Sequence, residues 1–243
     1  MSTYLLSGFE LFDGALSSIP DQKLLITTLN AHSYNITRQD DFYAESLAKS
    51  DILLPDGISV VWAIRLLTGK KLNKIAGADL FFFEMNRLNA HGGSCFFLGS
   101  SANTLKRIID RSSSEFPNVR VGKYSPPYKA EFTSEDNSLM LESVNTFKPD
   151  VLFVGMTAPK QEKWAYQHLG VLDAGHICCI GAVFDFYAGT VSRAPGWMIG
   201  IGLEWFYRLI KEPSRMWRRY LIGNSKFIWL VMKEKFGSGK SSI

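Results

Sequence analysis

Short apolar segments alternate with helical ones along most of this chain, and this alternation constrains the fold more than any other feature of the sequence. A crossover helix between two strands places them parallel in one sheet. The predicted strands cover residues 23–28, 51–54, 94–98, 119–124, 151–154 and 176–180. The predicted helices cover residues 37–48, 58–68, 80–88, 102–116 and 137–147, with one more after residue 159. We therefore predict an α/β fold, with a mainly parallel, Rossmann-like sheet and helices on both faces.

The C-terminal part of the chain has a different composition. From Glu204 to Phe236 it carries eight basic and three acidic residues, a formal charge of +5, which leaves −1 for the rest of a chain whose total is +4. Aromatic residues are interleaved with the basic ones, and Pro213 is expected to end one helix and begin another. Three interpretations of this segment are open: an amphipathic core helix with a solvated basic face, a pair of helices on a membrane surface, or a phosphate clamp. We predict an α/β catalytic and nucleotide-binding domain over residues 1–195 and a helical, membrane-associating appendage over residues 196–243.

Composition and motifs argue against several classes of protein. The three cysteines, Cys95, Cys178 and Cys179, are expected to be core residues of a protein in a reducing compartment. We expect no signal peptide, and no apolar run approaches the ~20 residues of a membrane-spanning helix. The four histidines lack ligand spacing, so no metal site is expected. No known nucleic-acid-binding motif is present, so nucleic acid is not an expected partner.

Asp56 lies in a turn between a predicted strand, residues 51–54, and a predicted helix that begins at Ile58. Pro55 and Gly57 interrupt the regular structure there. In an open α/β sheet the ligand crevice lies at the carboxyl ends of the strands, where a carboxylate can act as a general base. The alternative is that Asp56 only caps the N-terminus of the helix. The residue pattern leaves both roles open.

Several other strand ends are expected to meet at the same edge of the sheet. Glycine turns after strands let a nucleotide approach the backbone, and helix N-termini favour its phosphates. There is no G-x-G-x-x-G and no Walker A sequence, so the fingerprints of NAD-binding and P-loop proteins are missing. The turns are therefore either structural or part of a nucleotide site. The residues that this edge would bring together are Thr28, Asn30, Asp56, Gly99, Ser100, Tyr124, Pro127, Gly155, Lys160, Gln161 and Asp185.

A set of motifs, spaced along nearly the whole chain from about residue 23 to about residue 236, resembles one known family. The motifs are Thr28 to Asn35, Leu54-Pro55-Asp56-Gly57, Ala76-Gly77-Ala78-Asp79-Leu80, Ala158-Pro159-Lys160-Gln161-Glu162, Gly181 to Gly189, and the run from Arg193-Ala194-Pro195 to Gly223-Asn224. Together and in this order they resemble the WecG/TagA/CpsF family, glycosyltransferase family 26.

The resemblance implies an inverting, metal-independent transferase that uses no cofactor. It would move a hexose, an N-acetylhexosamine or its uronic acid from a UDP-sugar to a polyprenyl-diphosphate-linked sugar in bacterial surface polysaccharide biosynthesis. Such an enzyme would be cytoplasmic and peripheral on the inner face of the cell membrane, and it could form a homo-oligomer. The alternatives are another α/β nucleotide-binding enzyme, such as a methyltransferase, and a non-catalytic membrane-surface module.

The resemblance also implies roles for individual residues. Asp56 would be the catalytic base, with Thr28 beside it, and Gln161 would contact the reacting sugars. Lys74 stands where some relatives carry an arginine, and a lysine lacks the bidentate donor pair, so the role of this position stays open. Asp185 would line the nucleotide pocket, and three arginines would reach the diphosphate: Arg208, Arg215 and Arg218.

The residue types fit this chemistry on physical grounds. Displacement with inversion needs one base that takes the proton of the acceptor hydroxyl, and one carboxylate suffices. Without a metal ion, the leaving UDP needs cations to stabilise its charge, which arginines supply. A lipid-linked acceptor needs an apolar and basic surface near the site, which the C-terminal segment offers.

Overall fold

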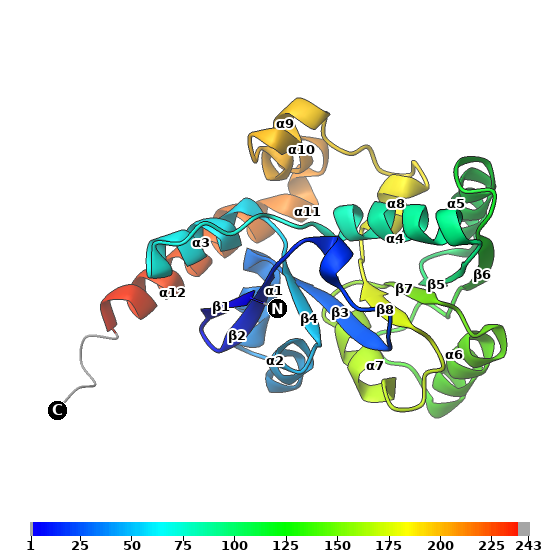
Figure 1. The fold of residues 1–243 in the computed structure, drawn as a ribbon. Helices are drawn as coiled ribbons and strands as arrows, with labels where there is room; N and C mark the ends of the chain where they lie inside the picture. Colours follow the sequence, from blue (N-terminus) through cyan, green and yellow to red (C-terminus); the bar gives the residue numbers. More distant parts are fainter. Residues whose placement is uncertain (1, 238–243) are drawn as a thin grey trace.

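A six-stranded parallel sheet forms the centre of the computed structural model, which describes residues 2–237 (Figure 1). Its strands are β3 (Leu24–Leu29), β4 (Ile52–Pro55), β5 (Ser94–Gly99), β6 (Arg120–Tyr124), β7 (Val151–Gly155) and β8 (His176–Cys179). Their spatial order is β4-β3-β8-β7-β5-β6, and every neighbouring pair is parallel. The predicted α/β class with a parallel sheet is therefore confirmed.

Helices cover both faces of this sheet because side chains alternate along each strand. Val151 and Phe153 of β7 pack on one face with α4 (Gly77–His91), α5 (Ala102–Glu115) and α8 (Val183–Tyr187). Leu152 and Val154 pack on the other face with α6 (Ser134–Phe147) and α7 (Lys160–His168). The three cysteines are buried and form no disulfide, as expected for core residues.

A third apolar cluster lies beyond the β4 edge and joins the two ends of the described chain. It contains an antiparallel hairpin, β1 (Ser2–Leu6) and β2 (Phe9–Asp13), together with α1 (Ala31–Thr37), α2 (Asp41–Ala48), α3 (Ile58–Thr68) and α12 (Gly223–Gly237). Phe227 and Val231 of α12 are buried there. The Ser7 amide and hydroxyl both donate to the Glu234 carboxylate, so the hairpin turn is tied to α12.

Two local features of this region differ from the sequence prediction. The hairpin was not predicted, although its turn residues Ser7 and Gly8 both have positive φ, at 48° and 90°, as a tight hairpin turn requires. The helix predicted over residues 37–48 is present as α2, but it begins at Asp41, and a separate helix that was not predicted, α1, ends at Thr37. Asn30 caps α1 and Asp40 caps α2, each through a side-chain oxygen that accepts backbone amides.

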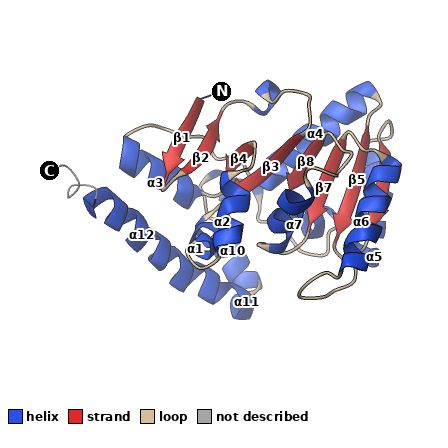
Figure 2. Ribbon diagram, turned by 90° about the horizontal axis from the view of Figure 1, so that it is seen from below, coloured by secondary structure: helices blue, strands red, loops and turns tan. Residues whose placement is uncertain are grey.

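The C-terminal helices lie over the carboxyl ends of the strands. In Figure 2 the arrowheads of the six-stranded sheet point toward the side where α10 (Glu204–Lys211) and α11 (Pro213–Trp217) lie. Pro213 separates these helices as predicted, and α11 continues through a π-helical turn at Arg218–Ile222 into α12. A short helix, α9 (Gly196–Gly200), precedes them, and a 3₁₀ turn covers Leu16–Ser18. Within the described residues, no helix has the length and apolarity needed to cross a bilayer.

The strand order creates a crevice between β5 and β7. The connection after β5 runs outward to β6, whereas the connection after β7 runs back to β8, so the two loops diverge at this point. Ligands bind at such switch points outside the carboxyl ends of parallel strands. Gly99 and Gly155 are paired there, and a Cβ on Gly99, at φ +122°, would come within 2.4 Å of the Gly155 carbonyl oxygen. Gly99 therefore has a packing function at the base of the crevice.

Candidate active site

A cleft of about 1640 Å³ lies between the carboxyl ends of the strands and the C-terminal helices. This volume exceeds the ~300–1,000 Å³ of a typical small-molecule site, so the cleft has room for two substrates. It collects residues from all the strand ends that the sequence pointed to. The predicted site residues that line it are Thr28, Asn30, Asp56, Lys74, Ser100, Pro127, Gly155, Lys160, Gln161, Asp185 and Arg208.

Four predicted site residues are not among those that line the cleft. Gly99 lies beneath its floor, and Tyr124 packs against the core on the α6 and α7 side. Arg218 is exposed, and its guanidinium carbon lies 5.2 Å from the centre of the Trp217 ring. The side chain of Arg215 is outside the described part of the structure.

Asp56 sits at the end of β4, directly beside the end of β3. Its amide donates to the Leu29 carbonyl over 2.9 Å, and its carboxylate lies 3.5 Å from the Asn30 amide nitrogen. Gly57, with φ at 108°, occupies the N-cap position of α3, and no side chain caps that helix. The alternative in which Asp56 is only a helix cap therefore does not hold, and its carboxylate is available to the cleft.

The surroundings of Asp56 make its carboxylate a stronger proton acceptor than a free aspartate. Burial raises the pKa of its carboxyl above the ordinary value, and the nearby carboxylate of Glu204 adds to this effect. Lys74, the Asn30 amide and Arg219 oppose the rise because they stabilise the charged form. A general base is most effective when its pKa lies nearer to the working pH than that of a free carboxylate.

Asn30 holds this corner of the cleft in place. Its side-chain oxygen accepts from the amides of His32 and Ser33, at 3.0 and 3.1 Å, so that the amide nitrogen is left facing Asp56. His32, one residue into α1, also lines the cleft. Burial and the charge of Arg219 lower the pKa of His32 to about 4, so its imidazole is neutral at pH 7.

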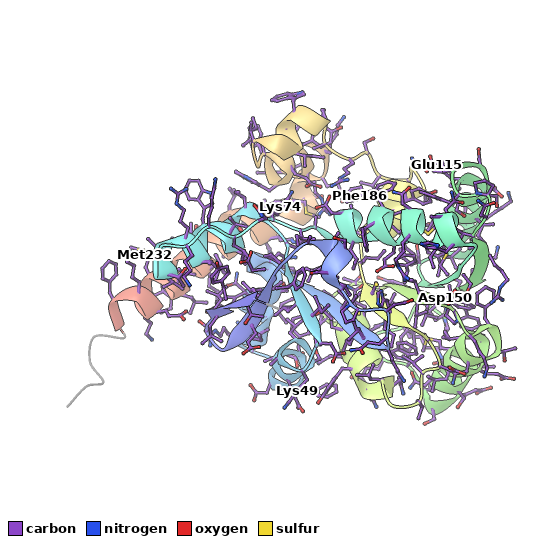
Figure 3. The ribbon with its side chains drawn as sticks, viewed as in Figure 1. Lys49, Lys74, Glu115, Asp150, Phe186 and Met232 are labelled. Atoms are coloured by element: carbon purple, nitrogen blue, oxygen red, sulfur yellow. The ribbon has the colours of Figure 1, made fainter. Side chains whose placement is uncertain are left out.

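Cations that line the cleft come from the C-terminal segment and from the loop before α4. Arg208 stacks over Phe186 at 5.4 Å, and its buried Nε has no hydrogen-bond partner among the described residues. Lys74 and Arg193 both approach the Glu204 carboxylate, at 3.8 and 3.6 Å. Figure 3 shows Lys74 and Phe186 on the side of the C-terminal helices, away from Asp150. These groups give the cleft a positive wall that suits an anionic ligand.

Arg219 and Glu162 are among the site residues that sequence reasoning missed. Arg219 lines the cleft where Arg218 was expected, and it is close enough to lower the pKa of His32 and to act on Asp56. The π-helical turn that begins at Arg218 changes which residue of the segment faces inward, and a regular helix pattern does not predict such a turn. Glu162, buried beside Gln161, also lines the cleft. Its place in the Lys160-Gln161-Glu162 motif was the available signal.

The arrangement supports proton abstraction next to an anion-binding wall. The carboxylate of Asp56, with its raised pKa, lies at the strand ends, and lysine and arginine side chains line the same cleft. A hydroxyl substrate that approaches Asp56 can lose its proton there, while a diphosphate is held by the cations. The described residues contain no group of three or more histidine, cysteine, aspartate or glutamate side chains that could hold a metal ion.

Residues 8–241 match the model of the Glycosyl transferase WecG/TagA/CpsF family. Two curated bacterial proteins are similar to this chain over 88% of its length. The one from Bacillus subtilis (strain 168) is 34% identical over 217 residues, which cover 82% of that protein. The one from Bacillus spizizenii is 30% identical over 215 residues, which cover 81% of that protein. Both are named N-acetylglucosaminyldiphosphoundecaprenol N-acetyl-beta-D-mannosaminyltransferase.

Proposed function

This chain belongs to the WecG/TagA/CpsF family of glycosyltransferases, and we propose that it transfers a sugar from a UDP-sugar to a sugar on a polyprenyl diphosphate. The names of the relatives support N-acetylmannosamine as the transferred sugar and lipid-linked N-acetylglucosamine as the acceptor. An N-acetylhexosamine is therefore the leading donor, ahead of a hexose or a uronic acid. Surface polysaccharide assembly is the process in which such a product is used.

The observation that carries the proposal is the position of Asp56. Its carboxylate takes the proton of the acceptor hydroxyl, and the hydroxyl oxygen then forms the new bond to the anomeric carbon. The bond from that carbon to the diphosphate oxygen breaks, and UDP leaves from the opposite face, so the anomeric centre is inverted. Thr28 and Gln161 line the same cleft and are the proposed contacts to the reacting sugars.

Cations take the place of a metal ion in this proposal. Arg208, Lys74 and Arg219 line the cleft, and we assign them to the leaving diphosphate, where negative charge would develop. Lys160, in the first turn of α7, and Asp185 of α8 also line the cleft and are the proposed contacts to the nucleotide. Metal independence and the contribution of Arg215 are part of the proposal, whereas Arg219, which lines the cleft, takes the role first expected of Arg218.

A membrane surface is the proposed location, because two neighbouring helices, α3 and α12, expose apolar side chains. Ile58, Trp62 and Leu66 recur every four residues on α3 and are 38%, 71% and 40% exposed. The neighbouring helix α12 exposes a second set of apolar residues: Ile228, Trp229, Met232 and Phe236. Basic residues interleaved with these side chains are attracted to anionic lipid. We propose that residues 196–243 act as the membrane-associating appendage, with the enzyme on the cytoplasmic face.

The test is a transfer assay with UDP-N-acetylmannosamine and a short-chain polyprenyl-diphosphate-N-acetylglucosamine, in excess EDTA, with the product identified by mass spectrometry. The expected result is a product that gains one N-acetylhexosamine, with release of UDP. UDP-glucose and the UDP-uronic acid serve as competing donors. Absence of transfer from all three donors would contradict the proposal, and protection of the fold by S-adenosylmethionine but not by UDP would favour a methyltransferase.

A further inference from the structure

Glu162 is the one buried carboxylate described on the floor of the cleft that the proposed reaction does not use. It lies in the first turn of α7, is 2% exposed and lines the cleft directly after Gln161. One of its oxygens, Oε1, accepts from the Gln161 side-chain nitrogen at 2.8 Å. The other oxygen, Oε2, is buried and has no hydrogen-bond partner within residues 2–237.

The contact with Glu162 fixes the orientation of the Gln161 amide. The Gln161 oxygen accepts from the Met156 amide at 3.2 Å while its nitrogen donates to Glu162. A flipped amide would place N–H against N–H at Met156 and oxygen against oxygen at Glu162, so only one orientation satisfies both neighbours. The nitrogen carries a second hydrogen, which is left for a group in the cleft. Gly181 packs against this amide, since a Cβ at that position would lie 3.4 Å from its oxygen and nitrogen.

The unpartnered oxygen indicates that Glu162 is a neutral acid in this arrangement. A buried carboxylate oxygen with a full charge and no partner is costly. Because Oε1 already accepts from Gln161, the proton belongs on Oε2, which then becomes a donor. Tyr43 of α2, whose buried hydroxyl also has no hydrogen-bond partner among the described residues, is close enough to interact electrostatically with Glu162. A neutral Glu162 avoids placing a negative charge beside the site of an anionic nucleotide.

We propose that Glu162 is a positioning residue of the transfer reaction, which acts through Gln161 by holding its amide toward the sugar, and which does so in its protonated form. The proposal rests on the proposed function, because it assigns Gln161 to the reacting sugar. It goes beyond it by making the protonation of a residue that does not touch the substrate a condition for transfer.

The titratable groups around Glu162 do not offer it a counter-charge. Tyr43 faces it from α2 and Cys179 from β8, and both are buried. The other acidic residues of α2 that reach α7 are engaged elsewhere, Asp40 with Lys163 and Glu45 with Tyr166. The facing strands β3 and β7 carry no titratable side chain. Burial accordingly raises the pKa of Glu162 to about 7, so its protonation changes within the working pH range.

The first experiment is a double-mutant cycle on kcat/KM at pH 6. Gln161→Ala and Glu162→Leu are each expected to lower kcat/KM roughly ten- to a hundredfold, since small misplacements near the reacting centre have effects of that size. The double variant is expected to have a kcat/KM no lower than that of the more impaired single variant, because Glu162 acts through Gln161. Glu162→Gln, which keeps both the acceptor oxygen and the shape of the neutral acid, is expected to stay within threefold or so of the parent at that pH.

The second experiment measures the pH profile of the same variants from pH 5 to 9. The parent should lose activity as the pH rises above about 7, whereas Glu162→Gln should keep its activity there. Glu84→Gln, a change at a buried glutamate remote from the cleft, is the matched control and should keep the parent profile. The role of Glu162 would be overturned if the losses in kcat/KM of the two single variants multiplied in the double variant. It would also be overturned if Glu162→Gln lost activity above pH 7 as the parent does. Absence of transfer by the parent would overturn the proposed function, and this role with it.

Discussion

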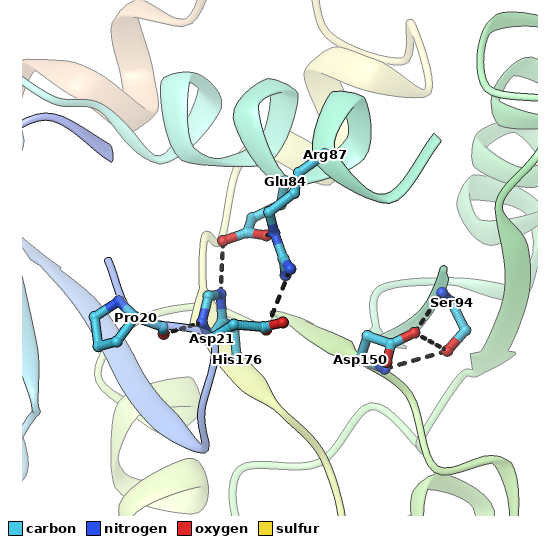
Figure 4. A network of polar contacts seen from close by, with 7 residues as sticks. All are labelled: Pro20, Asp21, Glu84, Arg87, Ser94, Asp150 and His176. Atoms are coloured by element: carbon cyan, nitrogen blue, oxygen red, sulfur yellow. Dashed lines mark hydrogen bonds and ion pairs between the residues drawn. The ribbon is translucent and has the colours of Figure 1, made fainter. Parts of the chain in front are cut away.

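Glu84 and Glu162 are both almost completely buried glutamates, at 0% and 2% exposed. They lie near opposite ends of the strands of the central sheet, in different surroundings. Near the amino ends of the strands, the two oxygens of Glu84 accept from His176 at 2.7 Å and from Arg87 at 2.8 Å (Figure 4). At the carboxyl edge, one oxygen of Glu162 accepts from a neutral amide and the other has no partner among the described residues. The first arrangement stabilises the fold, and the second leaves hydrogen-bonding capacity unused beside the cleft.

The network around Glu84 explains why a charged cluster is tolerated there. The two ring nitrogens of His176 face the Glu84 carboxylate and the Pro20 carbonyl, two acceptors, so both nitrogens donate and the ring is charged. Burial alone would lower the pKa of His176, but its contacts with Glu84 and Pro20 raise it above the ordinary value. Asp21 adds a second carboxylate to Arg87, and Asp150 binds Ser94 nearby. Buried polar groups can therefore be structural at one edge and functional at the other.

The largest expected effect belongs to the cleft edge. Asp56→Asn should lower transfer by roughly 10²–10⁴-fold while the fold and UDP binding are kept, because the amide cannot take the acceptor proton. Rate measurements with UDP release, together with UDP titration by calorimetry, check this. The raised pKa of Asp56 also predicts that parent activity falls on the acid side at a pH above the ordinary 3.8 of aspartate. Transfer at the parent rate by the Asn variant would show that Asp56 is not the base.

Glu84→Gln should have the next largest effect, and on stability instead of chemistry. It leaves His176 and Arg87 with one counter-charge fewer in a buried site, and breaking a buried ion pair costs roughly 3–5 kcal/mol. Urea unfolding would measure the loss, and the transfer rate well below the melting temperature should be unchanged. A variant with parent stability and impaired turnover would reverse the roles that we give to the two edges.

Arg219→Ala should weaken transfer roughly ten- to a hundredfold, since a charge-assisted hydrogen bond contributes about 1.5–3 kcal/mol. Arg218→Ala is the matched control, because the side chain of Arg218 is exposed and does not line the cleft. It should change the rate less than threefold or so, as an exposed charge contributes little. Steady-state kinetics on both variants would decide between them, and an equal loss in both would mean that the π-helical turn does not select the inward-facing arginine.

The smallest expected effect sharpens the contrast between the two glutamates. The pKa of Glu162 rises from 4.5 to about 7 on folding, so between these pH values the folded state binds a proton that the unfolded state has lost. The stabilisation from this proton is complete below pH 4.5 and disappears as the pH rises through 7. Glu162→Gln should therefore gain stability over the parent as pH increases, on the order of 1–3 kcal/mol at pH 8. A difference in unfolding free energy between variant and parent that stays constant from pH 5 to 8, as measured by urea unfolding, would contradict this.

The sheet and the strand-end positions of the site could be predicted from the sequence, because both follow from local patterns. The strand at 51–54 followed by Pro55 and Gly57 was enough to place Asp56 at a carboxyl end. The inward turn of Arg219 was not predictable, since it depends on one π-helical turn in a segment of mixed aromatic and basic residues. The state of Glu162 was not predictable either, because the sequence does not reveal which of its oxygens has a partner. The division at residue 195 stays a prediction.

The bond between Ser7 and Glu234 joins positions that are 227 residues apart in the chain. During synthesis at about 5–20 residues per second, the ribosome finishes the hairpin more than ten seconds before α12 exists. Until then, the apolar side chains that will receive Phe227 and Val231 remain uncovered. The helix that completes this part of the core also presents Trp229 and Phe236 outward. Completion of the core and the outward display of these aromatic side chains are therefore reached in the same step, after the strands of the central sheet have been made.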